Sequence, residues 1–445
     1  MIRDRRSVWR ILLGGAALAT FARILWAGAV QLSPDEAYYW SWGRDLALSY
    51  RDHPPLLGWI LGLIPASLGS SSEVWVRLPA LASGLLLFPL TYVLCREAAA
   101  SRVSSLLAAF TGCLCVMGCA GAVIVTPDAP LMVLWTLGLI LSVRFARGGS
   151  PWLLPAAAAA AGAACLAKLP GLLLLAGIGA ALASRRSLGS RLIAPAIAAA
   201  IAIAVPLTLL AIGELEPGPG PALFQLARLS SASPSIVGPP AFLAALIGLA
   251  GILPVGGAVL LASRRALRTS PALAVLAWSF WPAVAAFTLA AAVISVEPNW
   301  GAVAFPSLFA GWALVLDRLR ERGRGPAVAA VCLNVVVAVL VHLHAAGLLA
   351  PSLVGRGPAE KLHGWRELAL VVGSTDPGRL ETDEYELAAP LSYYGRGALD
   401  VILVAGEEPR GEPAAVWRIE DGRLGLERRV EGWRSGEGFR IRSGQ

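Results

Sequence analysis

The stretch LSPDEAYYWSWGRDLALSYRDHPPLLGW runs from Leu32 to Trp59 and follows the first long apolar run of the chain. It places two adjacent acids, Asp35 and Glu36, directly before a group of tyrosines and tryptophans, and it continues into the sequence YRDHPP at residues 50–55. A simple connection between two membrane helices has no need of acids, aromatic rings and a histidine together. The stretch therefore predicts a functional loop, and we expect the remaining helices to hold a cavity beneath it.

The rest of the chain is too apolar for a soluble protein. Of its 445 residues, 56% are hydrophobic and only 15% are charged, and the mean hydropathy is +0.66. Such a composition predicts that a lipid bilayer surrounds most of the chain. The net charge of +8 comes almost entirely from arginine. In a membrane protein this indicates cytoplasmic loops first, and no nucleic-acid partner is expected.

Apolar runs of about membrane length predict eleven or more transmembrane helices. The runs fall near residues 9–31, 79–95, 103–125, 128–145, 152–167, 169–184, 191–212, 240–263, 272–294, 300–317 and 326–350. Arginine clusters between them mark the cytoplasmic side. These clusters lie within residues 3–10, 96–102, 144–147, 185–191, 264–268 and 318–324. The N-terminus is therefore expected in the cytoplasm, and eleven crossings place the C-terminus outside.

Three apolar stretches have cytoplasmic clusters at both ends, so each must cross the membrane twice. Their turns are predicted at residues 126–128, 167–171 and 296–300, where proline also favours a break. Each turn opens on the side opposite to the arginines. Parity therefore gathers the polar residues of these turns on the outer face, together with the Asp35 loop; they are Asp128, Lys168, Glu297 and Asn299.

Two other segments lie outside the membrane in this scheme. Residues 213–238 are rich in Pro, Gly and Ser, with a short helix expected at Ala222–Leu229, and this outer loop is either a mobile cover or a long connection. After residue 350 the composition becomes soluble, with strands predicted at Leu368–Val372, Asp400–Val404 and Ala415–Ile419 and a helix at Asp383–Tyr394. The predicted organisation is a transmembrane domain at 1–350, with a first outer loop at 32–78, and a small extracytoplasmic α/β domain at 351–445.

Each candidate residue also has a simpler interpretation. Acids at a membrane surface can be merely solvated, whereas a carboxylate beside a leaving phosphate can act as a general base. Lys168 near a helix end can extend toward the surface, but a lone lysine among arginines also suits a phosphate. Asp128 after Thr-Pro can simply cap a helix. Composition and spacing leave these alternatives open.

A combination of motifs goes further than any one of them. PDEAYYWSWGRDLALSYRDHPPLLGW, TPDAPLMVLW, the Lys168 turn, VEPNWGAVAF and TDEYELAAPLSYYGRG follow one another along the chain. Together they resemble the bacterial membrane glycosyltransferases of the protein O-mannosyltransferase and aminoarabinose-transferase superfamily, which have the GT-C fold. The resemblance runs from about residue 10 to 400. One departure is Gly301, where a proline is expected after EPNW, and the tail after about residue 400 matches no motif.

The resemblance implies roles for the candidate residues. Asp35 is the catalytic acid/base, with Glu36 beside it, and Asp128 matches a second acidic position. Lys168 is a donor-phosphate ligand, and Arg51 and His53 match the HPP region near the same group. Substrate-binding roles fall to the remaining four candidates, which are Tyr38, Tyr39, Glu297 and Asn299.

The function implied is transfer of a sugar, a hexose or a pentose, from a polyprenyl-phosphate donor. The acceptor is a lipid, protein or glycan outside the cytoplasmic membrane, and the anomeric centre is inverted. The chain carries no Walker loop or dinucleotide-binding fingerprint, so no nucleotide cofactor is expected, and a divalent metal is left open. The alternatives are a transporter or lipid-linked sugar flippase, and a catalytically silent membrane scaffold. A transporter is disfavoured because the predicted polar groups gather at one face and the sequence shows no internal repeat.

Overall fold

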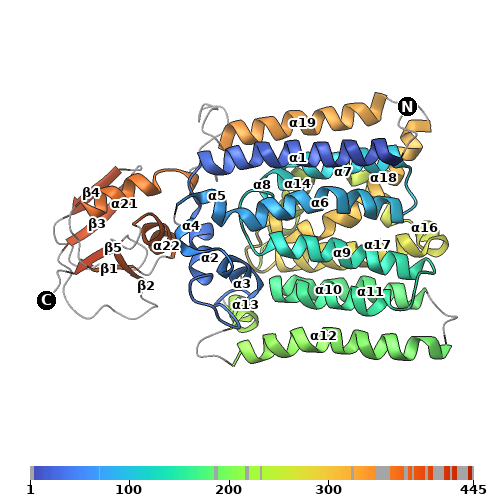
Figure 1. Cartoon of the computed structure of the whole chain (residues 1–445), viewed down its shortest axis with the longest axis horizontal. Helices are drawn as coiled ribbons and strands as arrows, with labels where there is room; N and C mark the ends of the chain where they lie inside the picture. Colours follow the sequence, from blue (N-terminus) through green and yellow to red (C-terminus); the bar gives the residue numbers. More distant parts are fainter. Residues whose placement is uncertain are drawn as a thin grey trace. The chain divides into compact units, whose positions relative to one another are not determined.

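A computed structural model of the chain shows two compact units that alternate along the sequence (Figure 1). The helical unit comprises Met1–Ile24, Leu46–Leu57 and Leu78–His342, and the mixed unit comprises Leu25–Asp45, Gly58–Arg77 and Leu343–Gln445. The structure describes residues 5–69, 71–184, 189–215, 220–230, 233–321, 325–345, 361–374, 379–382, 385–395, 399–403, 415–420, 423–427 and 439–442.

Every predicted apolar run contains a helix. These helices are α1 (Arg5–Ala29), α6 (Leu78–Glu97), α7 (Arg102–Leu114), α9 (Asp128–Ala146), α10 (Leu153–Ala167), α11 (Leu174–Ala183), α12 (Ile193–Gly213), α14 (Gly238–Ala250), α15 (Val255–Leu261), α17 (Pro271–Ala290), α18 (Phe305–Glu321) and α19 (Gly325–Ala345). Length and composition qualify six spans within the described residues as membrane-crossing, or seven if the bent pair α14 and α15 counts as one. The chain is therefore a multi-pass membrane protein with a nearly all-helical membrane part.

The core of the helical unit lies between helices that run side by side in Figure 1. Helix α10 packs against α9 and α12, and α9 packs against α6. Trp135 and Phe145 of α9 are fully buried there, together with alanines of α10. The α14–α15 pair bends by 114° next to Gly251, whose φ of 89° favours glycine. Three of the polar candidates, Asp128, Lys168 and Asn299, lie at other turns between the helices of this unit.

The mixed unit contains short helices and a five-stranded sheet. Its helices are α2 (Pro34–Trp42), α4 (Ala66–Gly69), α5 (Glu73–Val76), α21 (Trp365–Gly373) and α22 (Tyr385–Tyr394), while α3 (Leu56–Gly62) starts in the helical unit. The strands are β1 (Arg379–Thr382), β2 (Asp400–Leu403), β3 (Ala415–Glu420), β4 (Arg423–Glu427) and β5 (Phe439–Arg442), in the order β2-β1-β5-β3-β4. Among the strands that the structure describes, β1 and β2 pair in parallel and the other pairs are antiparallel. An apolar cluster joins α21, α22 and β1 around Val372, Leu380 and Leu391.

One predicted strand is wrong. Leu368–Val372 lies inside helix α21, where Ala369 and Val372 are buried while Leu370 is 70% exposed. A short apolar run does not distinguish a strand from a helix by its pattern, and here residues three apart face the core. The predicted strands starting at Asp400 and Ala415 are present, as is a helix over Tyr385–Tyr394, whereas residues 383, 384 and 404 lie outside the described ranges. Strands β1, β4 and β5 were not predicted.

The long segments predicted as loops contain helices too. Within residues 32–78, helices α2 to α5 form, and α13 (Pro221–Ser230) contains the short helix expected at Ala222–Leu229. The boundary expected between residues 350 and 351 falls among residues 346–360, which lie outside the described ranges, so it stays a prediction.

Candidate active site

Three chain turns of the helical unit bring their polar side chains into contact. Lys168 donates from Nζ to both carboxylate oxygens of Asp128, at 2.9 and 3.0 Å, and Asn299 donates from Nδ2 to Asp128 Oδ2 at 2.9 Å. Asp128 is the first residue of α9, Lys168 follows the last residue of α10, and Asn299 lies in the 3₁₀ helix η3 (Pro298–Ala304) before α18. We call these three residues the turn cluster.

The contacts decide two alternatives that the sequence left open. Asp128 does not cap its helix, because its carboxylate accepts from Lys168 and Asn299 instead. Lys168 does not extend to the surface, since it is only 6% exposed and pairs with a carboxylate that is 3% exposed. Burying two charges is costly unless they pair with good geometry. The two simpler interpretations are therefore excluded, and Lys168 and Asp128 form a specific buried pair.

His53 and Arg51 belong to the helical unit but take different positions. Burial, and next the positive charge of Lys168, lowers the pKa of His53 to about 3, so the imidazole is neutral and lies within the electrostatic reach of the turn cluster. Arg51 stacks its guanidinium over the ring of Phe224 in α13, 5.5 Å from the centroid. His53 can therefore contact a phosphate only as a neutral donor, whereas Arg51 would do so as a cation.

Arg228 of α13 is a residue that the motifs missed. Its guanidinium lies 5.0 Å from the centroid of the Trp300 ring, whose centroid is 5.6 Å from Lys168 Nζ, and it donates to the carbonyl of Ser295 at 2.8 Å. One signal for it was present, because Arg228 is the only basic residue in the outer loop 213–238. Glu297, in contrast, is exposed.

A cavity of about 700 Å³ opens beside Arg228 in the helical unit. Arg228, Ser233, Ser235 and Ser295 supply its polar side chains, and Phe242 and Ile294 are among its apolar ones. The cavity therefore offers a cation and hydroxyl groups next to an apolar surface, which suits an amphiphilic ligand.

Asp35 lies in the mixed unit, in the first turn of α2, and is half-buried. The hydroxyl of Tyr385 donates to Asp35 Oδ1 at 3.0 Å. Burial raises the pKa of Asp35, and the bond from Tyr385 acts against that rise. A carboxylate with a raised pKa is better matched to taking a proton near neutral pH than an ordinary aspartate.

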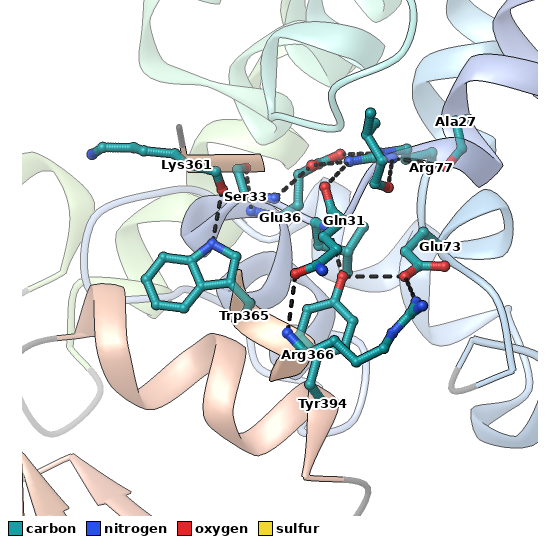
Figure 2. A network of polar contacts seen from close by, with 12 residues as sticks. Ala27, Gln31, Ser33, Glu36, Glu73, Arg77, Lys361, Trp365, Arg366 and Tyr394 are labelled. Carbon is teal, nitrogen blue, oxygen red and sulfur yellow. Dashed lines mark hydrogen bonds and ion pairs between the residues drawn. The ribbon is translucent and has the colours of Figure 1, made fainter. Parts of the chain in front are cut away.

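Glu36 is fully buried, whereas the adjacent Asp35 is half-buried (Figure 2 shows Glu36). Its carboxylate is fully buried and pairs with Arg77, which donates from Nε and Nη2 at 2.8 Å each. The other donors of Arg77 bond the carbonyls of Ala27, Val30 and Gln31, all at 2.8 Å. All five N–H groups of the guanidinium are therefore used. This geometry favours a structural role for Glu36.

The two candidate tyrosines of α2 also differ. Tyr39 is 7% exposed and packs edge-on against Trp42, 4.7 Å between centroids. Tyr38 is half-buried and lies 5.3 Å from the ring of Tyr385. Tyr38 is thus the one placed beside the Asp35–Tyr385 contact. Among the described residues, no three His, Cys, Asp or Glu side chains gather as a metal site would require, and the question of a metal stays open.

Comparison with known proteins bears on the family and the fold. Residues 52–209 match the family described as dolichyl-phosphate-mannose-protein mannosyltransferase. The crystal structure of apo ArnT from Cupriavidus metallidurans aligns with a TM-score of 0.60 over 89% of this chain and 75% of that chain. The family resemblance predicted from the motifs is confirmed. At 21% identity, the likeness to ArnT shows that the two chains share the GT-C fold.

Two further similarities are more limited. A stretch of 44 residues is 39% identical to the lipid A galacturonosyltransferase RgtD of Rhizobium johnstonii, and it covers 10% of this chain and 9% of that protein. The arabinosyltransferase EmbB of Mycobacterium smegmatis aligns with a TM-score of 0.46 and 15% identity, over 89% of this chain and 44% of that chain. RgtD is a glycosyltransferase by its name, as is the matched family.

Proposed function

We propose that this protein transfers a sugar from a polyprenyl-phosphate donor to a lipid, protein or glycan acceptor on the outer side of the cytoplasmic membrane, with inversion. One observation carries the proposal, the buried turn cluster of Asp128, Lys168 and Asn299 in a chain with the GT-C fold. The cluster lies at helix ends, where a lipid-borne sugar phosphate would meet polar groups. A nucleotide pocket is not required, because the leaving group needs only cationic help.

Lys168 is proposed to bind the donor phosphate. Its ammonium is a compact charge with three donors, and Asp128 fixes its position. Since Asp128 neutralises that charge, a phosphate gains from additional cations nearby. Arg228 supplies one beside Trp300, and Arg51 is a second. The cavity beside Arg228 is proposed to hold part of the polyprenyl chain.

Asp35 is proposed to be the general base. The acceptor hydroxyl or amine gives its proton to the Asp35 carboxylate as its lone pair forms a bond to the anomeric carbon. The bond between that carbon and the phosphate oxygen breaks, and its electron pair leaves with the phosphate. Attack from the side opposite to the phosphate inverts the anomeric centre. A positioned base of this kind typically contributes about 10²–10⁴ in rate.

The membrane arrangement is part of the same proposal. Eleven crossings with a cytoplasmic N-terminus, a domain boundary near residue 350 and an extracytoplasmic α/β domain follow from the arginine clusters and the change in composition. In the helical unit, Asn299 is proposed to support Asp128, and His53 and Glu297 are proposed to contact the donor less directly. In the mixed unit, Tyr38 is proposed to contact substrate near Asp35, with Tyr39 in a less direct role.

Two experiments test the proposal. A deletion strain should lack one sugar on an envelope component and accumulate a polyprenyl-phosphate sugar. An unchanged lipid profile with altered uptake or flipping would favour the transporter alternative.

In membranes with matched protein levels, Asp35→Asn should lower transfer of labelled sugar by about 10²-fold or more. Near-normal transfer by this variant would remove Asp35 from the mechanism.

A further inference from the structure

We infer that Tyr385 is a positioning residue that orients the Asp35 carboxylate and stabilises its ionised form, so that the segment after residue 361 takes part in proton transfer. The inference rests on the proposed role of Asp35 as the base. It assigns a catalytic purpose to a part of the chain that the motifs left without one. Every contact used lies within the mixed unit.

The geometry of the contact is specific. Tyr385 is the first residue of α22, and its hydroxyl donates to Asp35 Oδ1 at 3.0 Å although the two residues are 350 positions apart. A bond from a neutral hydroxyl to a carboxylate is charge-assisted and favours the ionised acid. It also orients the plane of the carboxyl group and leaves Oδ2 to face the acceptor.

Helix α22 is held firmly enough to aim that hydroxyl. At its other end, the hydroxyl of Tyr394 accepts from the backbone N–H of Leu32 at 2.7 Å and donates to Glu73 at 3.2 Å. Tyr393 donates to the carbonyl of Gly69 at 2.8 Å. The helix is thereby bonded to the residue that lies three positions before Asp35. Figure 2 shows Tyr394 within this network.

Helix α21 bonds the same short segment. Arg366 contacts Glu73 through its guanidinium and donates its backbone N–H to Gln31 Oε1 at 3.0 Å (Figure 2). Gln31 in turn donates from Nε2 to Glu367 at 2.8 Å. Both helices therefore hold the chain just before α2. If these two helices only held the chain in place, no contact with the Asp35 carboxylate would be needed. Tyr385 makes such a contact.

Other charged groups around Asp35 oppose one another. Lys361 lowers the pKa of Asp35, while Glu386 and Glu36 raise it. Lys361 is also paired with Glu386 at 2.8 Å, and both are largely exposed, so solvent screens them. Tyr385 is the group whose hydroxyl contacts Asp35 directly. Removal of this hydroxyl should therefore move the titration of Asp35 to higher pH.

The test measures that titration without any substrate. Dicyclohexylcarbodiimide attaches to protonated carboxyl groups in apolar surroundings, so the pH at which Asp35 stops reacting reports its pKa. The full-length protein in detergent would be treated across pH 4–9, and the Asp35 peptide quantified by mass spectrometry. In Tyr385→Phe, labelling of Asp35 should persist to higher pH than in the wild type.

Tyr393→Phe is the matched control, because it removes one hydroxyl bond of the same helix without touching Asp35. It should leave the labelling midpoint unchanged. An unchanged or lower midpoint in Tyr385→Phe overturns the inference, as does an equal shift in Tyr393→Phe. If Tyr385→Phe fails to fold, 3-fluorotyrosine placed at position 385 keeps the test open. It preserves the ring packing and makes the hydroxyl a stronger donor, so the labelling midpoint of Asp35 must fall if this bond stabilises the ionised acid.

Kinetics then separate this inference from the proposed function. With a transferable donor in hand, Tyr385→Phe should lower kcat by about tenfold with little change in KM, and the acidic limb of its pH–rate profile should move to higher pH. If Asp35→Asn retains transfer, the proposed function of Asp35 fails. If Asp35→Asn is inactive while Tyr385→Phe keeps the wild-type profile, only the present inference fails.

Discussion

The pairing of Lys168 with Asp128 changes how the donor-phosphate role should be tested. Replacing Lys168 alone leaves a carboxylate buried without its cation, which typically costs about 3–5 kcal/mol of folding stability. A loss of activity in Lys168→Met would then mix two causes. The informative variant is the double substitution Asp128→Asn with Lys168→Met, which removes both charges and leaves no buried ion unpaired.

The two roles predict different outcomes for this pair of variants. If Lys168 binds the phosphate, the double variant should regain most of the stability that Lys168→Met loses. It should still show a donor KM raised by about tenfold to a hundredfold, because a charge-assisted bond contributes roughly 1.5–3 kcal/mol. If the pair only stabilises the turns, the double variant should regain both stability and donor affinity.

The assay needs two measurements on the same preparations. Thermal unfolding of purified protein in detergent gives the stability of the wild type, Lys168→Met and the double variant. Transfer of labelled sugar in membranes, at matched protein levels and varied donor concentration, gives KM and kcat. A double variant with the wild-type donor KM would refute the phosphate role of Lys168.

Three further predictions concern His53, Glu36 and the membrane topology. Because His53 is neutral at working pH, the donor KM of the wild type and of His53→Gln should depend on pH in the same way between pH 5 and 8. A change in KM over this range that is present in the wild type and lost in His53→Gln would show that the imidazole takes up a proton. Glu36→Gln leaves Arg77 buried without its carboxylate, so stability should fall by about 3–5 kcal/mol while transfer per folded molecule stays near normal; a stable but inactive variant would argue for a catalytic Glu36. Reporter fusions after Arg186 and Arg356, both outside the described ranges, should lie inside and outside respectively, and finding both on one side would contradict the parity argument.

The proximity of the turn-cluster residues could be predicted from the sequence, because the order of arginine clusters and apolar stretches along the chain is enough to assign each turn to one side of the membrane. Arginine clusters at both ends of an apolar stretch require a turn between them, and the polar residues of three such turns were predicted to share one face. In the helical unit, Lys168 and Asn299 both donate to Asp128. Parity also placed Glu297 on that face, and its side chain is exposed, whereas Asp128 and Lys168 are buried. A count of crossings has no information on which side chains of a turn point inward.

Contacts between residues far apart in the sequence could not be predicted from it. Tyr385 lies 350 residues from Asp35, and Arg77 lies 41 residues from Glu36. Each partner is an ordinary residue in its own surroundings, and only the folded chain gives it a role. Arg228 shows the intermediate case, because its position as a lone cation in a polar loop was visible but its contact with Trp300 was not.

The orientation of helix α2 about its axis determines which of the two adjacent acids, Asp35 or Glu36, is buried and which is accessible. Adjacent residues on a helix point about 100° apart, so one acid can face the interior while the other faces outward. The capping box sets which is which: Ser33 accepts from the backbone N–H of Glu36, and the Glu36 carboxylate accepts from the backbone N–H of Ser33. That exchange holds Glu36 against Arg77 and leaves Asp35 half-exposed beside Tyr385. Exchanging the two acids, Asp35→Glu with Glu36→Asp, should therefore not preserve activity, because a shortened carboxylate at position 36 cannot reach both Ser33 and Arg77.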